Sequence, residues 1–165
     1  MHSRIIGLTA AGLAGAILAS ASWAVDDAVF IQDAIKGSLA EVKMGQLAQQ
    51  NGATTEVRSL GSKLMSDHSA TLNQATSLAQ SIGAPVPEQP SPDALTEYAR
   101  LQNLRGAAFD KAFVDHMVAD HKKEIAKFGE QARTSSDPVA QFAKSSLPAL
   151  QMHLDMAQDL ARQQK

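Results

Sequence analysis

The chain is organised around one stretch, Phe109–Phe128, which reads FDKAFVDHMVADHKKEIAKF. Large apolar residues recur along it at the spacing of an α-helix, which turns about 100° per residue. Their face also carries Asp120 and Glu124, and it is flanked by His116 and His121. A surface helix normally keeps carboxylates and imidazoles opposite its large apolar side chains. The stretch therefore predicts a helix that carries titratable groups into a helical core.

The composition of the chain fits one helical domain. It has 165 residues, of which 44% are hydrophobic, enough to bury a core. Helix-forming residue types dominate, and β-branched residues form no alternating runs, so helices are predicted throughout. Lys and Arg number 15 against 17 Asp and Glu, and 4% of residues are aromatic. This balance argues against a nucleic-acid partner, and the absence of cysteine excludes disulfides and thiolate metal sites.

The N-terminal residues have the pattern of an export signal. A positive start precedes an apolar run over Ile5–Leu18, and small residues then allow cleavage after Ala21 or Ala24. We predict a cleaved signal peptide over 1–24 and a single domain over 25–165. The apolar run is shorter than a typical membrane span, although an uncleaved anchor is the alternative. The processed chain is then expected in the periplasm, without a transmembrane segment.

Helix signals divide the mature chain into four long segments. These segments cover about 27–51, 54–82, 107–135 and 137–165. Thr54 or Thr55 is the predicted N-cap of the second segment, Asp137 is that of the fourth, and Gly83 ends the second segment. Four of the six prolines fall in a crossover over about 84–106, which includes a short helix near 93–104. The pattern predicts an all-α, ferritin-like four-helix bundle with one long Pro-rich crossover between two antiparallel helical hairpins.

All four segments bring a polar group to a similar depth, because antiparallel helices rise equally per residue. Counted from the first turn, Glu41 and His68 are level to within one helical turn. Counted from the second turn, His121 and His153 are near neighbours in depth. Imidazole and carboxylate groups suit zinc, iron, manganese or copper, and helical bundles build such sites from facing helices. The predicted ligands are His68, His121, Glu124 and His153, with Glu41, Asp67, His116 and Asp120 as alternates or as residues that orient the ligands.

Other interpretations of these polar groups stay open. A buried histidine is commonly a hydrogen-bonded core residue, and a buried polar layer can fix helix register without a ligand. The chain would then be a non-enzymatic envelope protein that acts in stress or binds a protein partner. A haem held by methionine and histidine, or a redox or hydrolytic enzyme, is a weaker alternative. The sequence has no phosphate loop, nucleophile elbow or cysteine, so no catalytic residue is assigned.

Five segments resemble a known family. They are Glu41–Ala48 (EVKMGQLA), Met65–His68 (MSDH), Gly106–Asp110 (GAAFD), Met117–His121 (MVADH) and Leu147–His153 (LPALQMH). In this order, over nearly the whole mature chain, they are similar to the bacterial domain-of-unknown-function family 4142 (DUF4142). The resemblance implies an exported, ferritin-like bundle of the periplasm or outer membrane, with no established activity. Ferritin-like di-iron sites use Glu-x-x-His pairs, and this sequence has none, so those ligands are not transferred to it.

Overall fold

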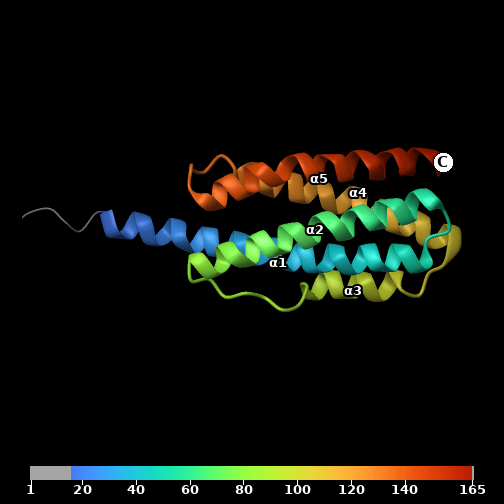
Figure 1. The fold of residues 1–165 in the computed structure, drawn as a ribbon, viewed down its shortest axis with the longest axis horizontal. Coiled ribbons are helices and arrows are strands. Elements are labelled where there is room, and N and C mark those ends of the chain that lie inside the picture. The colour runs from blue at the N-terminus through green and yellow to red at the C-terminus, as the bar shows by residue number, and fades with distance from the viewer. Residues whose placement is uncertain (1–15, 165) are drawn as a thin grey trace, which may run out of the picture.

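Residues 16–164 form five helices in the computed structural model, and side chains are described from residue 26 onward. The helices are α1 (Ala16–Asn51), α2 (Thr55–Ser81), α3 (Pro92–Leu101), α4 (Gly106–Gln131) and α5 (Pro138–Gln163). No strand occurs within these residues, so the predicted all-α class is confirmed. Figure 1 shows the four long helices packed side by side, with the short α3 against the outside. The short helix contacts both α1 and α4.

The predicted signal peptide falls largely outside the described residues. The structure describes nothing before Ala16, where α1 begins, and no side chain before Asp26. Export and cleavage therefore stay predictions. Among the helices of residues 16–164, none combines the length and the apolar character needed to cross a membrane.

The helix ends follow the sequence signals. Thr54 Oγ1 accepts a hydrogen bond from Val57 N at 3.3 Å, and Asp137 Oδ1 accepts one from Ala140 N at 2.8 Å. Both predicted N-caps are thus confirmed. Gly83 follows α2 with a φ of 70°, a left-handed conformation that glycine adopts without strain. Both α3 and α4 end earlier than predicted, because tight i, i+3 hydrogen bonds follow their last turns.

Two glycines allow α1 and α2 to pack closely. A Cβ atom on Gly45 would lie 2.5 Å from the carbonyl oxygen of Gly61, and one on Gly61 would lie 2.7 Å from Ala48 Cβ. Both distances are too short for a real Cβ atom, so the helices could not keep this spacing with larger residues. Gly45 lies one helical turn after Glu41, so the contact sets the depth of α2 beside this buried carboxyl group.

The buried apolar side chains form two separate clusters. The first apolar cluster lies near the α1–α2 turn and includes Met44, Leu60, Leu64, Phe109, Phe113, Met117 and Leu160. The second apolar cluster lies toward the α4–α5 turn and includes Phe30, Ile31, Ile35, Ala79, Phe128, Phe142 and Leu150. Between the two clusters, each long helix contributes polar residues, which we call the polar layer. Its members are Ser38 and Glu41 of α1, His68 of α2, Asp120, His121 and Glu124 of α4, and His153 of α5.

Asp110 of α4 ties this helix to the α1–α2 turn. Its carboxylate oxygens accept hydrogen bonds from Ala53 N at 2.8 Å and from Thr54 N at 3.0 Å. The hydroxyl group of Thr54 donates a further bond at 3.0 Å. The side chain is only 3% exposed, so water cannot readily replace it as the acceptor. This contact holds the two helical pairs in register at the end nearest the first apolar cluster.

We expect Asp110→Ala to lower the free energy of unfolding by about 2–4 kcal/mol, because two backbone N–H groups lose a charged acceptor. Urea denaturation followed by circular dichroism measures the change. Asp115→Ala is the matched control: Asp115 is exposed on the same helix and pairs with the exposed Lys111, so its loss should cost less than about 0.5 kcal/mol. Equal effects of the two substitutions would contradict the role given to Asp110.

Candidate metal centre

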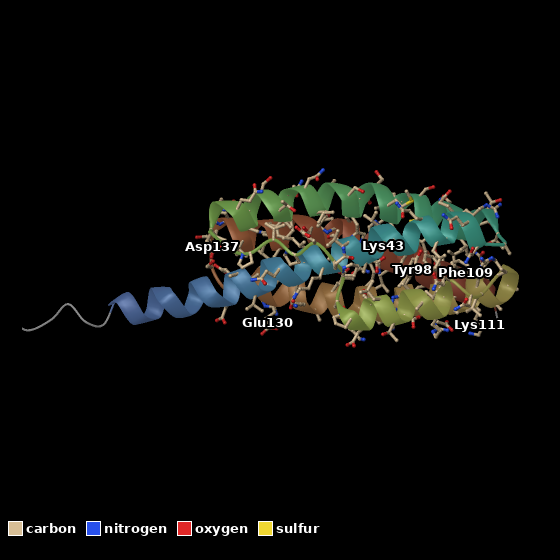
Figure 2. All side chains as sticks on the ribbon, turned by 90° about the horizontal axis from the view of Figure 1, so that it is seen from below. Lys43, Tyr98, Phe109, Lys111, Glu130 and Asp137 are labelled. Carbon is tan, nitrogen blue, oxygen red and sulfur yellow. The ribbon has the colours of Figure 1, made fainter. Side chains whose placement is uncertain are left out.

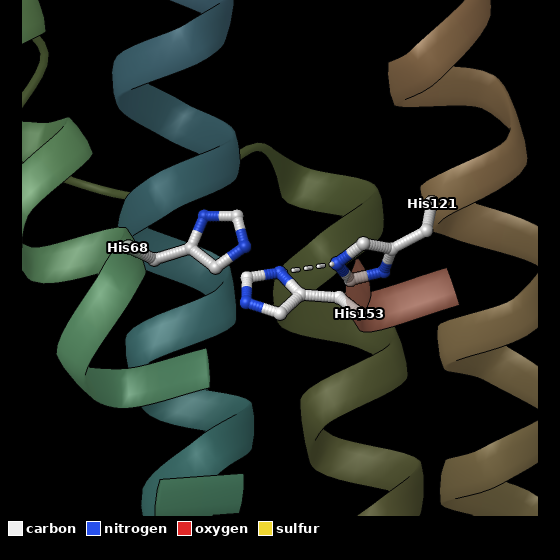
Figure 3. Close-up of side chains that lie close together, drawn as sticks. All are labelled: His68, His121 and His153. Atoms are coloured by element: carbon white, nitrogen blue, oxygen red, sulfur yellow. Dashed lines mark hydrogen bonds between the residues drawn. The ribbon is translucent and has the colours of Figure 1, made fainter. Parts of the chain in front are cut away.

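Three of the four predicted ligands converge in the polar layer. His68, His121 and His153 come from α2, α4 and α5, and their exposures are 3%, 0% and 1%. One ring nitrogen of each lies within 4.8 Å of the other two, and we call this group the histidine cluster. Figure 3 shows the three rings facing one another, with centroids 5.3–5.8 Å apart. The predicted depth match is confirmed, since His121 Nε2 lies 3.3 Å from His153 Nδ1.

The tautomers of two histidines follow from their neighbours. A neutral imidazole has one N–H group and one lone pair, and the N–H must face an acceptor. His121 Nδ1 lies 3.1 Å from the Met117 carbonyl oxygen, so this nitrogen carries the hydrogen. His153 Nε2 lies 2.8 Å from Asp67 Oδ2, so it carries the hydrogen of that ring. The remaining nitrogens, His121 Nε2 and His153 Nδ1, therefore both present lone pairs.

These two lone pairs face each other across 3.3 Å, which is the contact drawn as a dashed line in Figure 3. Two acceptors at this distance repel, so something positive is needed between them. A proton on one ring would serve, but burial, aided by the charge of His153, lowers the pKa of His121 to about 4. Burial likewise lowers the pKa of His153. Near neutral pH the pair therefore lacks the proton that would make it a hydrogen bond.

The ring nitrogens of His68 also lack hydrogen-bond partners within residues 26–164. Both its ring nitrogens are enclosed, and neither has a hydrogen-bond partner among the described residues. Burial, with the neighbouring His121 and His153, lowers its pKa well below the ordinary value. An unpartnered buried polar group costs about 1–3 kcal/mol, so the neutral ring is destabilising unless it gains a ligand. A cation bound by all three rings would satisfy one nitrogen of His68 and both facing lone pairs.

Asp67 connects the histidine cluster to the surface. It accepts hydrogen bonds from His153 and from Lys63, whose Nζ lies 2.9 Å from Oδ2. Burial raises the pKa of Asp67, but these two hydrogen bonds outweigh it and leave the pKa below its ordinary value. The carboxylate thus stays ionised and fixes the orientation of His153. Beyond it, Asp67 and Lys63 line a surface pocket of about 470 Å³, together with Pro148.

The fourth predicted ligand belongs to a different group. Glu124 lies with Glu41 and Asp120, whose charges influence one another, on the side of α4 that faces α1. A ligand atom from each of Glu41, His116 and Asp120 lies within 4.8 Å of the others. We call these four residues the carboxylate cluster. The structure thus divides the predicted ligands and alternates into two groups, with Asp67 supporting the first.

Glu41 and Glu124 of the carboxylate cluster hold protons more tightly than isolated carboxyl groups do. Burial, followed by the charges of Glu124 and Asp120, raises the pKa of Glu41 well above its ordinary value. Burial, followed by the charge of Asp120, raises the pKa of Glu124 to about 8. In the absence of a cation, Glu124 is therefore largely protonated near neutral pH.

Two residues that support these groups were not among the predicted ones. Lys63 precedes Asp67 by four residues. This spacing favours an ion pair on one helical face, so the sequence could have indicated the role of Lys63. Gly37 gives room to Glu124, since a Cβ atom there would lie 2.9 Å from Glu124 Oε1. A glycine inside a helix costs about 1 kcal/mol relative to alanine, so its position was a signal of close packing.

The raised pKa of Glu124 predicts how stability depends on pH. Between pH 4.5 and about 8 the unfolded chain releases this proton while the folded chain keeps it. Stability is therefore full below pH 4.5 and is lost as the pH rises toward 8, by up to about 1.4 kcal/mol per pH unit. We expect Glu124→Gln to remove this loss, so its advantage over the wild type should grow from pH 5 to pH 8.

Urea denaturation at several pH values, in the presence of a chelator, measures this effect. His121 acts in the opposite direction: its contribution is full above pH 6.5 and is lost as the pH falls toward 4. Glu124→Gln should therefore keep the loss of stability that His121 causes as the pH falls toward 4. A constant difference between wild type and variant from pH 5 to pH 8 would contradict the assignment.

Comparisons with known proteins identify a similar helical structure and a matching family. The crystal structure of a DUF305 fragment from Deinococcus radiodurans is similar, with a TM-score of 0.71 and 18% sequence identity. The match covers 82% of this chain and 95% of that one, and at this identity it supports the helical fold alone. A comparison with curated proteins found no match. The family model described as "Domain of unknown function (DUF4142)" matches residues 13–160, so the chain belongs to the DUF4142 family.

Proposed function

We propose that the protein binds a transition-metal ion through His68, His121 and His153, and that it acts in metal handling or in protection against oxidative stress. The observation that carries this proposal is the pair of facing lone pairs on His121 Nε2 and His153 Nδ1, 3.3 Å apart. Two nitrogen ligands of a tetrahedral ion, each bonded at about 2.0–2.1 Å, lie about 3.3–3.4 Å apart. The distance between the two nitrogens therefore fits a shared ion.

The surroundings of the two rings support the same proposal. Histidines that bind a metal normally donate their second N–H to a carbonyl oxygen or a carboxylate, which fixes the tautomer. His121 has the Met117 carbonyl oxygen in this role, and His153 has Asp67. A buried histidine in a purely structural role needs no such alignment of lone pairs toward a common point.

The donor set limits the choice of metal. Three neutral imidazoles suit zinc, copper and iron better than manganese, which prefers oxygen ligands. Three protein ligands leave a fourth position for water or another small ligand. An ion bound there would supply a Lewis acid if it is zinc, or a redox centre if it is copper or iron. No residue of the histidine cluster is placed as a nucleophile, so we favour a binding role over an enzymatic one.

The proposal includes the wider organisation of the protein. We propose that residues 1–24 are removed on export and that residues 25–165 act in the periplasm as a single domain. We also propose that the helices follow the ferritin-like connectivity, with the segment 84–106 as the crossover. This is supported by the packing of α1 against α2 and of α4 against α5, with α3 between the two pairs in sequence.

Metal removal and replacement test the histidine cluster. After treatment with a chelator, the protein is given zinc, copper(II), iron(II) or manganese, desalted, and analysed for bound metal. Wild-type protein should keep one equivalent of zinc or copper, and an ion present at 100 times its dissociation constant should stabilise the fold by about 2.7 kcal/mol. His68→Ala and His121→Ala should lose both the bound ion and the stabilisation.

His116→Ala is the matched control, because it makes the same change on α4 outside the histidine cluster. It should retain zinc as the wild type does. Asp67→Asn keeps all three imidazoles but removes the carboxylate, and it should weaken binding by about 10–100-fold. If no ion shifts the melting midpoint, or if His68→Ala and His121→Ala bind metal as the wild type does, the proposal is wrong.

A further inference from the structure

The carboxylate cluster forms the inner wall of a cavity between α1 and α4. Glu41 projects from α1, while His116, Asp120 and Glu124 follow one another at four-residue intervals along α4. This spacing aligns the three side chains of α4 on one helical face. The cavity has a volume of about 440 Å³, and all four residues line it. The space is sufficient for an ion with several water molecules.

Two carboxylate oxygens in this cluster have no partner. Glu41 is 1% exposed, and its Oε2 atom makes no hydrogen bond within the described part of the chain. Glu124 Oε2 is also enclosed and unpartnered among these residues. A buried oxygen without a partner is destabilising, and more so when it is charged, so a group that binds both oxygens would be stabilising.

The basic residues around the cavity do not neutralise its inner carboxyl groups. Lys36 and Lys127 both line the cavity, but the Nζ atom of each contacts Asp33 at its rim. Within residues 26–164, no salt bridge reaches Glu41, Asp120 or Glu124; the ion pairs of this region involve other carboxylates. Lys123 also lines the cavity, and the charge of Lys127 acts on Glu124 from a distance. This charge offsets only part of the effect of burial, so the three inner carboxyl groups still lack a paired cation within residues 26–164.

The helix opposite α4 leaves space for one of these carboxylates. A Cβ atom on Gly37 would lie 2.9 Å from Glu124 Oε1, a distance that would force the carboxylate to move. Glu97 of α3 lies on the far side of the cluster, with Oε1 3.8 Å from His116 Nδ1. This distance is too long for a hydrogen bond, so Glu97 places a carboxylate near the His116 ring without fixing its orientation.

We propose that Glu41, His116, Asp120 and Glu124 form a second metal site, which prefers a divalent cation with affinity for oxygen ligands, Mn²⁺ or Fe²⁺. Three carboxylates and one imidazole are a harder donor set than the three imidazoles of the histidine cluster. The two sites share no residue, so this proposal does not depend on the proposed function. The protein would then hold two metals of different preference, on adjacent faces of α4.

Calorimetric titration of chelator-treated protein with Mn²⁺ tests the second site. Wild-type protein should bind one equivalent, and Glu41→Gln should weaken the affinity by at least about tenfold, since even residues that only orient ligands contribute that much. Gly37→Ala should also weaken it, because it displaces the Glu124 carboxylate without altering any ligand. Glu130→Gln is the matched control: Glu130 projects from the outer side of α4 in Figure 2 and should bind Mn²⁺ as the wild type does.

Thermal melting provides a second measurement on the same variants. In the chelator, Glu41→Gln should melt at least as high as the wild type, because it removes the cost of burying an acid whose Oε2 atom has no partner among the described residues. With Mn²⁺ the order should reverse, since only the wild type gains the full stabilisation. If Glu41→Gln does not fold, Asp120→Asn replaces it in both measurements.

His121→Gln distinguishes the two sites. It should lose zinc and keep Mn²⁺, whereas Glu41→Gln should keep zinc and lose Mn²⁺. A wild type that binds zinc but not Mn²⁺ or Fe²⁺ overturns the second site and leaves the proposed function standing. A wild type that binds Mn²⁺ but not zinc or copper overturns the proposed function and leaves the second site standing. Equal Mn²⁺ affinity in wild type, Glu41→Gln and Gly37→Ala also overturns the second site.

Discussion

The burial of a polar layer between two apolar clusters is the constraint on which the rest of the structure depends. Removing imidazole and carboxyl groups from water is costly unless each gains a partner. The apolar clusters on either side supply the compensating burial, and the close contact at Gly45 and Gly61 holds α1 and α2 at matching depth. Such a layer is unusual because several of its atoms, on His68, Glu41 and Glu124, lack partners among the described residues.

Helix α4 serves both sides of this layer because of its geometry. Neighbouring residues on a helix point about 100° apart, so Asp120 and His121 lie on different faces. His121 turns toward α2 and α5 and joins two further imidazoles, while Asp120 turns toward α1 and joins other carboxyl groups. One helix can therefore direct imidazole nitrogen donors to one face and carboxylate oxygen donors to another, even from neighbouring residues. The pKa shifts on the two faces have opposite directions because burial disfavours the charged form of each group. Burial therefore lowers the pKa of His121 and raises the pKa of Glu124.

Helix type and depth were accessible from the sequence because they depend on local rules. Thr54 and Asp137 mark helix starts through side chains that bond to nearby backbone groups, so a few residues suffice to recognise them. The match in depth of His121 and His153 required only a turn position and equal rise per residue. The grouping of Glu124 with His121 was a prediction from spacing, and spacing alone did not resolve which face of α4 each side chain would occupy. That choice depends on how α1, α2 and α5 are arranged around the helix.

The sequence alone thus determined the order of the helices, their caps and the presence of a polar layer. The division of that layer into a histidine cluster and a carboxylate cluster was not, because it arises from the packing of four helices. The same holds for the hydrogen bonds that fix two tautomers and for the space that Gly37 leaves to Glu124. Contacts between residues far apart in sequence, such as Asp67 and His153, come from interhelical distances that no local pattern encodes. Those distances determine which lone pairs meet, and so which chemistry the layer can support.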